Sequence, residues 1–523
     1  MKDAAQRAQI PPSAEPPSAL SLDEVRRCTN LLEAIANDRF LLVGLPETER
    51  IAFLAAAGRV VHPDRDTKSR LAKALRRERK QTKFKHDREI RATTEIRTLR
   101  RAAVFTVPQL PPPPTEGGPE RLLEVPRRCY VCKAEYRKLH FFYDMMCVEC
   151  ADFNYAKRTQ RAPLSGKVAL ITGARVKIGY QASLMLLRSG ARVIATTRFP
   201  KDAAQRYVQE PDFADWSHRL HIHGLDLRHA PSVELFARHI EQTHHRLDIL
   251  INNAAQTVRR PPGFYEHLLE GELRPFAALP PETRPLLSGH EECVAAVTPA
   301  LGAGGEDSTL VPTWQSRDPA LGIHSSAALS LLPYALEQEG DTQTLFPKGR
   351  LDADLQQVDL REMNSWRMKL ADVSTAEMLE VHLVNAVAPF ILCGKLKPLM
   401  MRDRSSPGHI VNVSAMEGSF SRGTKTDKHP HTNMAKAALN MMTLTSAPDY
   451  AKDRIYMNAV DTGWVTDEDP AMHAERKQQE LDFQPPLDIV DGAARVVDPV
   501  MTMENTGQYA WGNFFKDYRH TSW

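Results

Sequence analysis

Residues 167–198 read KVALITGARVKIGYQASLMLLRSGARVIATTR. The apolar, β-branched start predicts a buried strand that ends at Thr172, and Gly173 permits a tight turn after it. A helix is expected to begin near Ile178, where Gly179 lets the helix pack closely on the strand. Such a turn points backbone N–H groups and the positive end of a helix at a phosphate. The stretch therefore predicts a nucleotide-binding α/β unit.

Further apolar runs, one at the end of this stretch and the others after it, predict more strands of the same sheet. They lie at 191–197, 220–227, 248–254, 409–415 and 455–461. Strands that are apolar throughout are typical of a parallel sheet covered on both faces. Ser374 and Glu377 form a capping-box pattern for a helix that should end near Met401. We therefore expect residues 165–255 and 371–523 to form one Rossmann-type, doubly wound parallel sheet, with 256–370 as a long insertion of loops and short helices.

These residues resemble the short-chain dehydrogenase/reductase family. Its TGxxxGxG signature matches Thr172, Gly173 and Gly179, with Lys177 in place of the middle glycine, and its NNAG motif resembles residues 252–255, NNAA. Asp226, after the third strand, matches the position that binds the adenine amino group. The resemblance and the fold together imply cofactor contacts at Thr172, Gly173, Arg175, Lys177, Ile178, Gly179, Thr197, Arg198, Asp226, Leu227, Asn253, Ala254 and Lys436.

The end of the second strand indicates which cofactor is used. An acidic residue there binds a ribose 2'-hydroxyl, whereas a basic one accommodates a 2'-phosphate. This chain has Thr197 followed by Arg198, and Arg175 and Lys177 add positive charge in the glycine turn. NADP is therefore favoured over NAD. The alternative is that these bases simply face solvent.

The predicted catalytic site lacks its usual acid. The resemblance assigns Asn385, Ser414 and Lys436 to this site, but Thr432 stands where the family has its tyrosine. An aliphatic hydroxyl is a far weaker acid than a phenol, whose pKa is about 10.

Three readings of this substitution remain open. Thr432 could relay a proton from His431 or His429. A tyrosine of the insertion, Tyr265 or Tyr334, could enter the site. Otherwise the hydride chemistry is lost and the domain only binds NADP.

Four of the seven cysteines form two close pairs, Cys129 with Cys132 and Cys147 with Cys150, separated by fourteen residues. Two CxxC pairs suit tetrahedral zinc, and four thiolates leave no open position for catalysis. We expect a small zinc-ribbon-like module at residues 119–160.

The N-terminal region differs in character. At 523 residues the chain should hold several units: a disordered tail at 1–20, a helical basic region at 21–104 and a Pro-rich linker at 105–118. Residues 62–101 contain fifteen Lys or Arg and six Asp or Glu, a net charge of +9. A solvated helix, or one that docks on an acidic protein, is favoured over a nucleic-acid contact, because Phe84 is the only aromatic residue in this segment.

No apolar run approaches the ~20 residues of a membrane span, and no secretion leader is recognisable. The sequence predicts an intracellular, most simply cytoplasmic, NADP-binding oxidoreductase with an undetermined small-molecule substrate. The alternative is a non-catalytic NADP-binding regulator or adaptor that binds a macromolecule through the zinc module and the insertion.

Overall fold

The computed structural model describes residues 21–102, 121–297, 318–332, 342–352 and 356–523. They form two compact units, with the division after Lys83. The predicted tail at 1–20, the linker at 105–118 and Tyr334 lie outside the described residues.

The larger unit is built on an eight-stranded sheet in the order β10-β9-β8-β7-β6-β3-β4-β5. Neighbours from β5 to β9 are parallel, and β10 returns antiparallel to β9. The strands are β3 (Val168–Thr172), β4 (Arg192–Thr197), β5 (Leu220–Gly224), β6 (Ile249–Asn252), β7 (Gly408–Ser414), β8 (Ile455–Asp461), β9 (Phe514–Lys516) and β10 (Arg519–Thr521). The order reverses direction between β3 and β6, and ligands of such sheets bind at that reversal, beyond the carboxyl ends of the strands.

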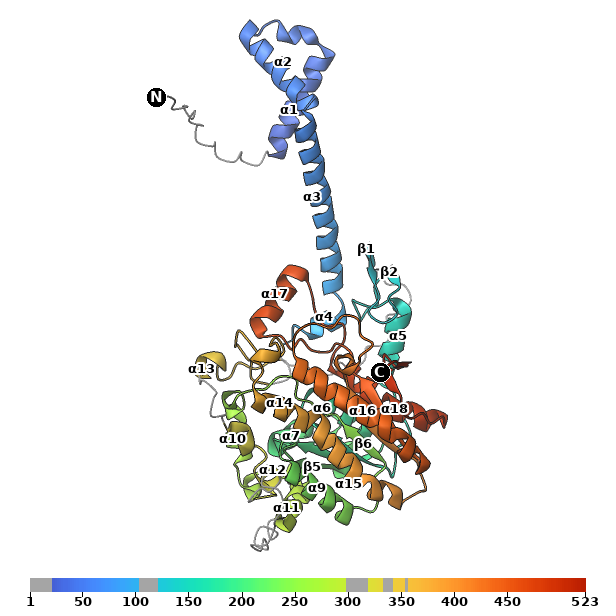
Figure 1. Cartoon of the computed structure of the whole chain (residues 1–523). Helices are drawn as coiled ribbons and strands as arrows, with labels where there is room; N and C mark the ends of the chain where they lie inside the picture. The colour runs from blue at the N-terminus through green and yellow to red at the C-terminus, as the bar shows by residue number, and fades with distance from the viewer. Residues whose placement is uncertain (1–20, 103–120, 298–317, 333–341, 353–355) are drawn as a thin grey trace, which may run out of the picture. The chain divides into compact units, whose positions relative to one another are not determined.

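Helices cover both faces of this sheet (Figure 1). One apolar core includes residues of α6 (Lys177–Arg188), α7 (Pro200–Val208) and α18 (Ile489–Thr506). The other includes residues of α9 (Ala230–Thr243), α15 (Ala388–Arg402) and α16 (Pro430–Lys452). The sheet draws strands from both sides of the predicted insertion, which confirms the doubly wound α/β fold.

The helix predicted from Ser374 is continuous but changes its winding. It runs as α14 (Thr375–His382), a π-helical turn η8 (Leu383–Val387) and α15, and the Ser374 side chain accepts a hydrogen bond from the backbone N–H of Glu377. The span Thr375–Arg402 is long and apolar enough to cross a membrane, but 56% of its apolar window is buried. Burial against the sheet explains this apolar composition, so the span is only weak evidence for a membrane segment.

The insertion contains mostly short helices. These are η3 (Pro262–Phe264), α10 (Glu266–Glu272), η4 (Phe276–Ala278), α11 (Arg284–Val297), α12 (Leu321–His324), η6 (Ala328–Leu331) and α13 (Thr342–Leu345), followed by η7 (Leu370–Asp372). The longest, α11, packs beside β5, the edge strand of the sheet. The insertion therefore shields part of an edge that would otherwise be open to pairing.

The cysteine module joins the larger unit through its own apolar cluster. It contains β1 (Leu122–Arg128), β2 (Glu135–Lys138) and α5 (Val148–Lys157), and its core residues pack with Val465, Leu487 and Ile489. The larger unit also contains α8 (Phe213–Trp216), η2 (Ser217–Arg219), η9 (Met416–Gly418) and α17 (Ala471–Leu481).

The smaller unit is helical, as predicted. It contains α1 (Leu22–Asn37), η1 (Arg39–Leu42), α2 (Glu47–Val61) and the first part of α3 (Arg65–Ala92). The basic segment is exposed along most of α3. Its continuation belongs to the larger unit, where Arg91 near the end of α3 and Arg97 in α4 (Glu95–Leu99) are buried. These two guanidinium groups pair with Asp482 and Asp144, which explains how charged residues enter the interior.

Candidate cofactor and active site

The turn between β3 and α6 is shaped for a close approach of the backbone. Gly173 has a φ of +70°, which favours glycine. A Cβ added to Gly179 would lie 2.2 Å from the carbonyl oxygen of Gly173 and 2.4 Å from Nδ2 of Asn253. Asn253 donates to the carbonyl oxygens of Thr172 and Gly173 at 2.9 and 3.2 Å, and the N–H of Ala254 donates to Oγ1 of Thr172. Hydrogen bonds and close packing thus connect the glycine turn and Thr172 to the residues that follow β6.

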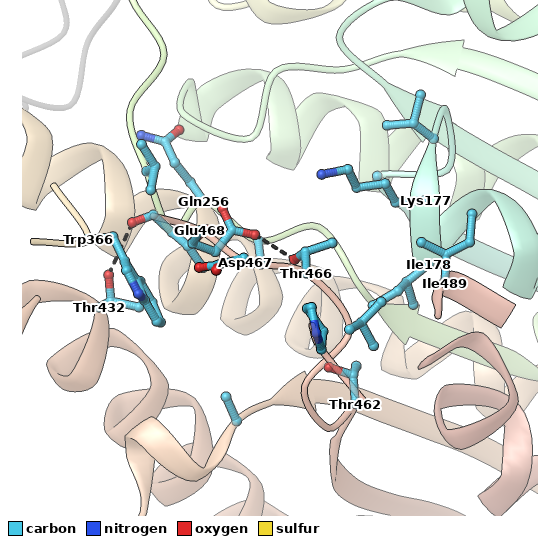
Figure 2. A pocket seen from close by; sticks show the side chains of 18 of the residues that line it. Lys177, Ile178, Gln256, Trp366, Thr432, Thr462, Thr466, Asp467, Glu468 and Ile489 are labelled. Carbon is cyan, nitrogen blue, oxygen red and sulfur yellow. Dashed lines mark hydrogen bonds between the residues drawn. The ribbon is translucent and has the colours of Figure 1, made fainter. Parts of the chain in front are cut away.

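This turn opens on a cavity of about 1610 Å³ beyond the carboxyl ends of the strands. Lys177, Ile178, Ala254 and Leu227 line it. Lys177 stands where the family has a glycine, and its φ of +54° lies in the left-handed region that favours glycine. A non-glycine residue in this conformation costs about 1–2 kcal/mol. The chain tolerates this cost, and the lysine side chain faces the cavity (Figure 2).

At the end of β4, the insertion holds Arg198. The guanidinium donates to the hydroxyl oxygens of Tyr265 at 2.8 Å and Ser330 at 3.1 Å, and it lies 4.7 Å from the centre of the Tyr265 ring. Thr197 accepts a hydrogen bond from the N–H of Phe199, which shapes the turn after the strand. The structure thus holds a guanidinium at the edge of the cavity, at the strand end from which the sequence predicted the cofactor preference.

Two other predicted cofactor residues are already paired. The Asp226 carboxylate is 1% exposed and accepts hydrogen bonds from the backbone N–H and the guanidinium of Arg228. Burial raises the pKa of Asp226, but the Arg228 charge and hydrogen bonds outweigh this and lower it overall. Arg175 pairs with Asp202 at 2.7 Å. These contacts satisfy both groups inside the protein, although both residues still line the cavity.

Three of the four predicted catalytic residues meet at the cavity. Ser414 ends β7, and its hydroxyl donates to Oδ1 of Asn440 on α16. Lys436 donates from Nζ to the carbonyl oxygen of Val413 at 2.8 Å, and burial lowers its pKa to about 8. Thr432, one helical turn before Lys436, is 1% exposed, with Oγ1 3.5 Å from the carbonyl oxygen of Thr257.

Asn385, the fourth, does not line the cavity. It lies in the π-helical turn, where its side chain donates to the carbonyl oxygen of Gln256 at 2.8 Å and accepts from the N–H of Gln256 at 3.1 Å. Gln256 follows β6 and lines the cavity. Asn385 therefore fixes the chain that borders the cavity rather than a reacting atom.

The structure separates the proposed substitutes for tyrosine. His429 lines the cavity and stacks on Trp366 with ring centres 4.0 Å apart. His431 is 2% exposed and is not among the lining residues, and burial lowers its pKa. Tyr265 lies at Arg198, at the end of β4.

An acidic run, Asp467, Glu468 and Asp469, lines the cavity and was not foreseen from the sequence. Figure 2 shows Glu468 and Lys177 facing the same space, and Glu468 accepts a hydrogen bond from Thr466. Burial alone would raise the pKa of Glu468, but the charges of Lys177 and Arg260 and nearby hydrogen bonds lower it overall. The run follows β8 in a loop without periodicity, so the only signal was its position after a strand.

The four cysteines come together as predicted. Their sulfur atoms lie within 4.8 Å of one another, and Sγ of Cys132 is 3.7 Å from Sγ of Cys147. This spacing is too long for a disulfide, and it matches the roughly 3.8 Å between sulfurs of a tetrahedral site with zinc bonds of about 2.3 Å. All four are free thiols in the structure. The donor set and geometry fit zinc.

Two family models match the sheet domain. One, described as short chain dehydrogenase, matches residues 167–269. The other, described as Enoyl-(Acyl carrier protein) reductase, matches residues 349–487. Residues 270–348, between the two matches, fall inside the predicted insertion.

Several relatives share parts of the chain. An uncharacterized protein of Acanthamoeba polyphaga mimivirus is 29% identical over 403 residues, which are 75% of this chain and 74% of that protein. Retinol dehydrogenase 13 of Homo sapiens is 34% identical over 96 residues, and (+)-neomenthol dehydrogenase of Capsicum annuum is 37% identical over 93 residues. These last matches cover 18% and 17% of this chain and only 28% and 29% of the two enzymes.

Among solved structures, NADPH-bound carbonyl reductase from chicken fatty liver aligns with a TM-score of 0.40 and 17% identity, covering 69% of this chain and 100% of that chain. At this level the fold assignment rests on the sheet topology and the family models.

Proposed function

Because this chain is a member of the short-chain dehydrogenase/reductase family, we propose that it binds NADP(H) and acts as an oxidoreductase on a small alcohol or carbonyl compound. The main observation behind this proposal is that the glycine turn, Arg198 and Lys436 all line the same cavity. The relatives named as dehydrogenases of retinol and neomenthol support this substrate class.

The residues present fit the cofactor. The turn of Gly173 and Gly179 leaves no room for a Cβ, which suits a backbone that lies against a diphosphate. Arg198 would hold the 2'-phosphate, with Tyr265 and Ser330 fixing its orientation. Bound NADPH would supply the hydride. This arrangement supports NADP over NAD.

This site lacks the tyrosine that would normally donate the proton. The ammonium form of Lys436 would stabilise a neighbouring oxyanion, since an opposite charge favours the ionised form. Thr432 can pass on a proton but is too weak an acid to supply one. Of the two histidines considered, His429 is the one that lines the cavity. We therefore propose a non-standard active site in which Thr432 relays a proton and His429, which lines the cavity, is its candidate source.

A non-catalytic NADP-binding regulator or adaptor is the second candidate. It is favoured by the Ser414 hydroxyl, which donates to Asn440, and by Asn385, which stands outside the cavity. In that case the insertion or the N-terminal region would bind a protein partner. A nucleic-acid contact of the basic segment is the less favoured version of this proposal.

One experiment separates the two candidates. Purified protein is titrated with NADPH and with NADH. The complex of the protein with the reduced cofactor is then mixed with a panel of ketones, aldehydes and quinones. Binding of NADPH with carbonyl-dependent oxidation supports the enzyme, and binding without oxidation supports the regulator. If neither cofactor binds, both proposals fail.

We also propose that the four cysteines hold one zinc ion per chain. Metal analysis of the protein, with a Cys129→Ser/Cys132→Ser variant as control, tests this. The protein would then work in a reducing intracellular compartment, most simply the cytoplasm, because all seven cysteines are free thiols in the structure.

A further inference from the structure

One wall of the cavity is built by the segment between β8 and α18, residues 462–488, which includes α17. Gly463, Trp464 and Gln484 of this segment line the cavity. It also carries the acidic run that contains Glu468. Whatever fixes this segment therefore also fixes the space available to the cofactor and substrate.

The cysteine module holds this wall near its start. Tyr130 lies between the paired ligands Cys129 and Cys132, and its hydroxyl accepts a hydrogen bond from the backbone N–H of Trp464 at 3.0 Å. A Cβ added to Gly463 would come within 3.1 Å of the same hydroxyl oxygen. Tyr130 itself lines the cavity. The module thus contributes a side chain to the candidate active site.

Buried charges hold the far end of the same wall. Arg97 donates to the Asp482 carboxylate at 2.6 Å and to Asp144 of the module at 2.7 Å. Arg158, just after α5, makes two hydrogen bonds to Asp488 at 2.8 and 2.9 Å. Removing one partner of such a buried pair leaves an uncompensated charge, which is strongly destabilising. The wall therefore cannot leave the module without a large cost.

The position of Tyr130 depends on the fold of the cysteine loops. The N–H of Cys129 donates to the carbonyl oxygen of Ala134 at 2.8 Å, and the N–H of Tyr130 donates to the carbonyl oxygen of Met145 at 2.8 Å. Met145 lies two positions before Cys147, the first residue of the second cysteine pair. The two loops around Tyr130 are thus the loops that a bound metal would tie together, because small sites of this type fold on their metal.

We propose that zinc on the four cysteines fixes Tyr130, and that Tyr130 in turn positions residues 462–488 as the closed wall of the cofactor cavity. Tyr130 is a positioning residue, since it acts through the Trp464 backbone. Loss of the metal would loosen this wall and weaken cofactor binding. The effect on cofactor affinity rests on the proposed function, whereas the effect on the wall does not.

The test compares the full-length, zinc-loaded protein with a Tyr130→Phe variant and with protein stripped of metal by a chelator. Tyr155→Phe is the matched control, because the Tyr155 hydroxyl is buried in the same module without a partner among the described residues. Amide hydrogen exchange of residues 462–488, zinc content and NADPH affinity are measured for each. Exchange in β3 and β7 reports whether the sheet remains folded.

Tyr130→Phe should retain zinc, while exchange at 462–488 rises by about fivefold and NADPH binds about fivefold more weakly, the size expected for one lost hydrogen bond. Metal removal should increase exchange at 462–488 further, and Tyr155→Phe should match the natural protein. Unchanged exchange at 462–488 in Tyr130→Phe would overturn the proposal, even if stripping the metal unfolds the whole protein. If the natural protein binds no NADPH, the proposed function fails, and the exchange data still decide the role of Tyr130.

Discussion

Replacing Arg198 by methionine tests how the chain selects its cofactor. The guanidinium has five N–H groups, and those used on Tyr265 and Ser330 are on Nη2 and Nη1. The remaining N–H groups have no partner among the described residues and are free to meet a phosphate. Methionine keeps much of the apolar stem but removes the charge and every donor.

The expected loss follows from these contacts. A hydrogen bond to a charged group is worth about 1.5–3 kcal/mol. Arg198 is half-buried, and salt screens it only partly. We therefore expect about 2 kcal/mol, or roughly a thirtyfold rise in the Kd for NADPH. The Kd for NADH, which has no 2'-phosphate, should change by less than about twofold.

The measurement is a fluorescence titration with each cofactor at low and high salt. Lys425→Met is the matched control, because Lys425 lines the same cavity but follows β7 rather than β4. It should leave the preference for NADPH unchanged. If Arg198→Met weakens both cofactors equally, Arg198 supports the fold and not the choice of cofactor. If it weakens neither, the assignment of the 2'-phosphate to the end of β4 is wrong.

Three further changes test the rest of the site. Gly179→Ala should cost about 1–3 kcal/mol of stability and lower NADPH affinity, because the new Cβ collides with the Gly173 carbonyl, whereas Gly394→Ala, with open space around it, should not destabilise the protein in thermal unfolding. Thr432→Tyr should increase carbonyl reduction by about 10²-fold or more, since it restores a phenol one turn from Lys436. Natural turnover that survives Thr432→Val would instead show that the hydroxyl is not used. Lys436→Met should raise the melting temperature at pH 7 while weakening NADPH binding. Burial lowers the Lys436 pKa from 10.5 to about 8, so below pH 8 the folded natural protein carries the free-energy cost of a buried charge. This cost disappears as the pH rises towards 10.5. A stability difference between the two proteins that does not shrink over that pH window would contradict this account.

Local sequence patterns were enough to predict six of the eight strands of the sheet, β3 to β8, whereas the three-residue strands β9 and β10 were not predicted. The runs that became β3, β4 and β8 are mainly apolar or β-branched and are buried at nearly every position, and a buried parallel strand leaves this signal in the residues of the strand itself. The glycines of the turn were predictable for the same reason, because backbone geometry and close packing restrict those positions to glycine. The cysteine pairs could be recognised because metal geometry restricts the spacing of ligands.

The composition of the cavity wall could not be predicted in this way. Asp226 and Arg228 are close in sequence. Whether the Asp226 carboxylate faces a ligand or the Arg228 guanidinium nevertheless depends on side-chain rotamers and burial. The contact of Arg198 with Ser330 joins residues 132 positions apart, and that of Tyr130 with Trp464 joins residues 334 positions apart. No periodic signal records such contacts.

The sequence by itself determined the family, the order of strands and helices, the glycine turn and the cysteine pairs. Each is encoded by residues within one element or one short motif, where covalent geometry and burial act over a few residues. Only the tertiary structure decided that Tyr265 and Ser330 of the insertion bind Arg198, that Asn385 supports the chain that borders the cavity, and that Tyr130 of the cysteine module lines it. These depend on the path of the whole chain, because hydrogen bonds and ion pairs form only where that path brings distant residues within a few ångströms.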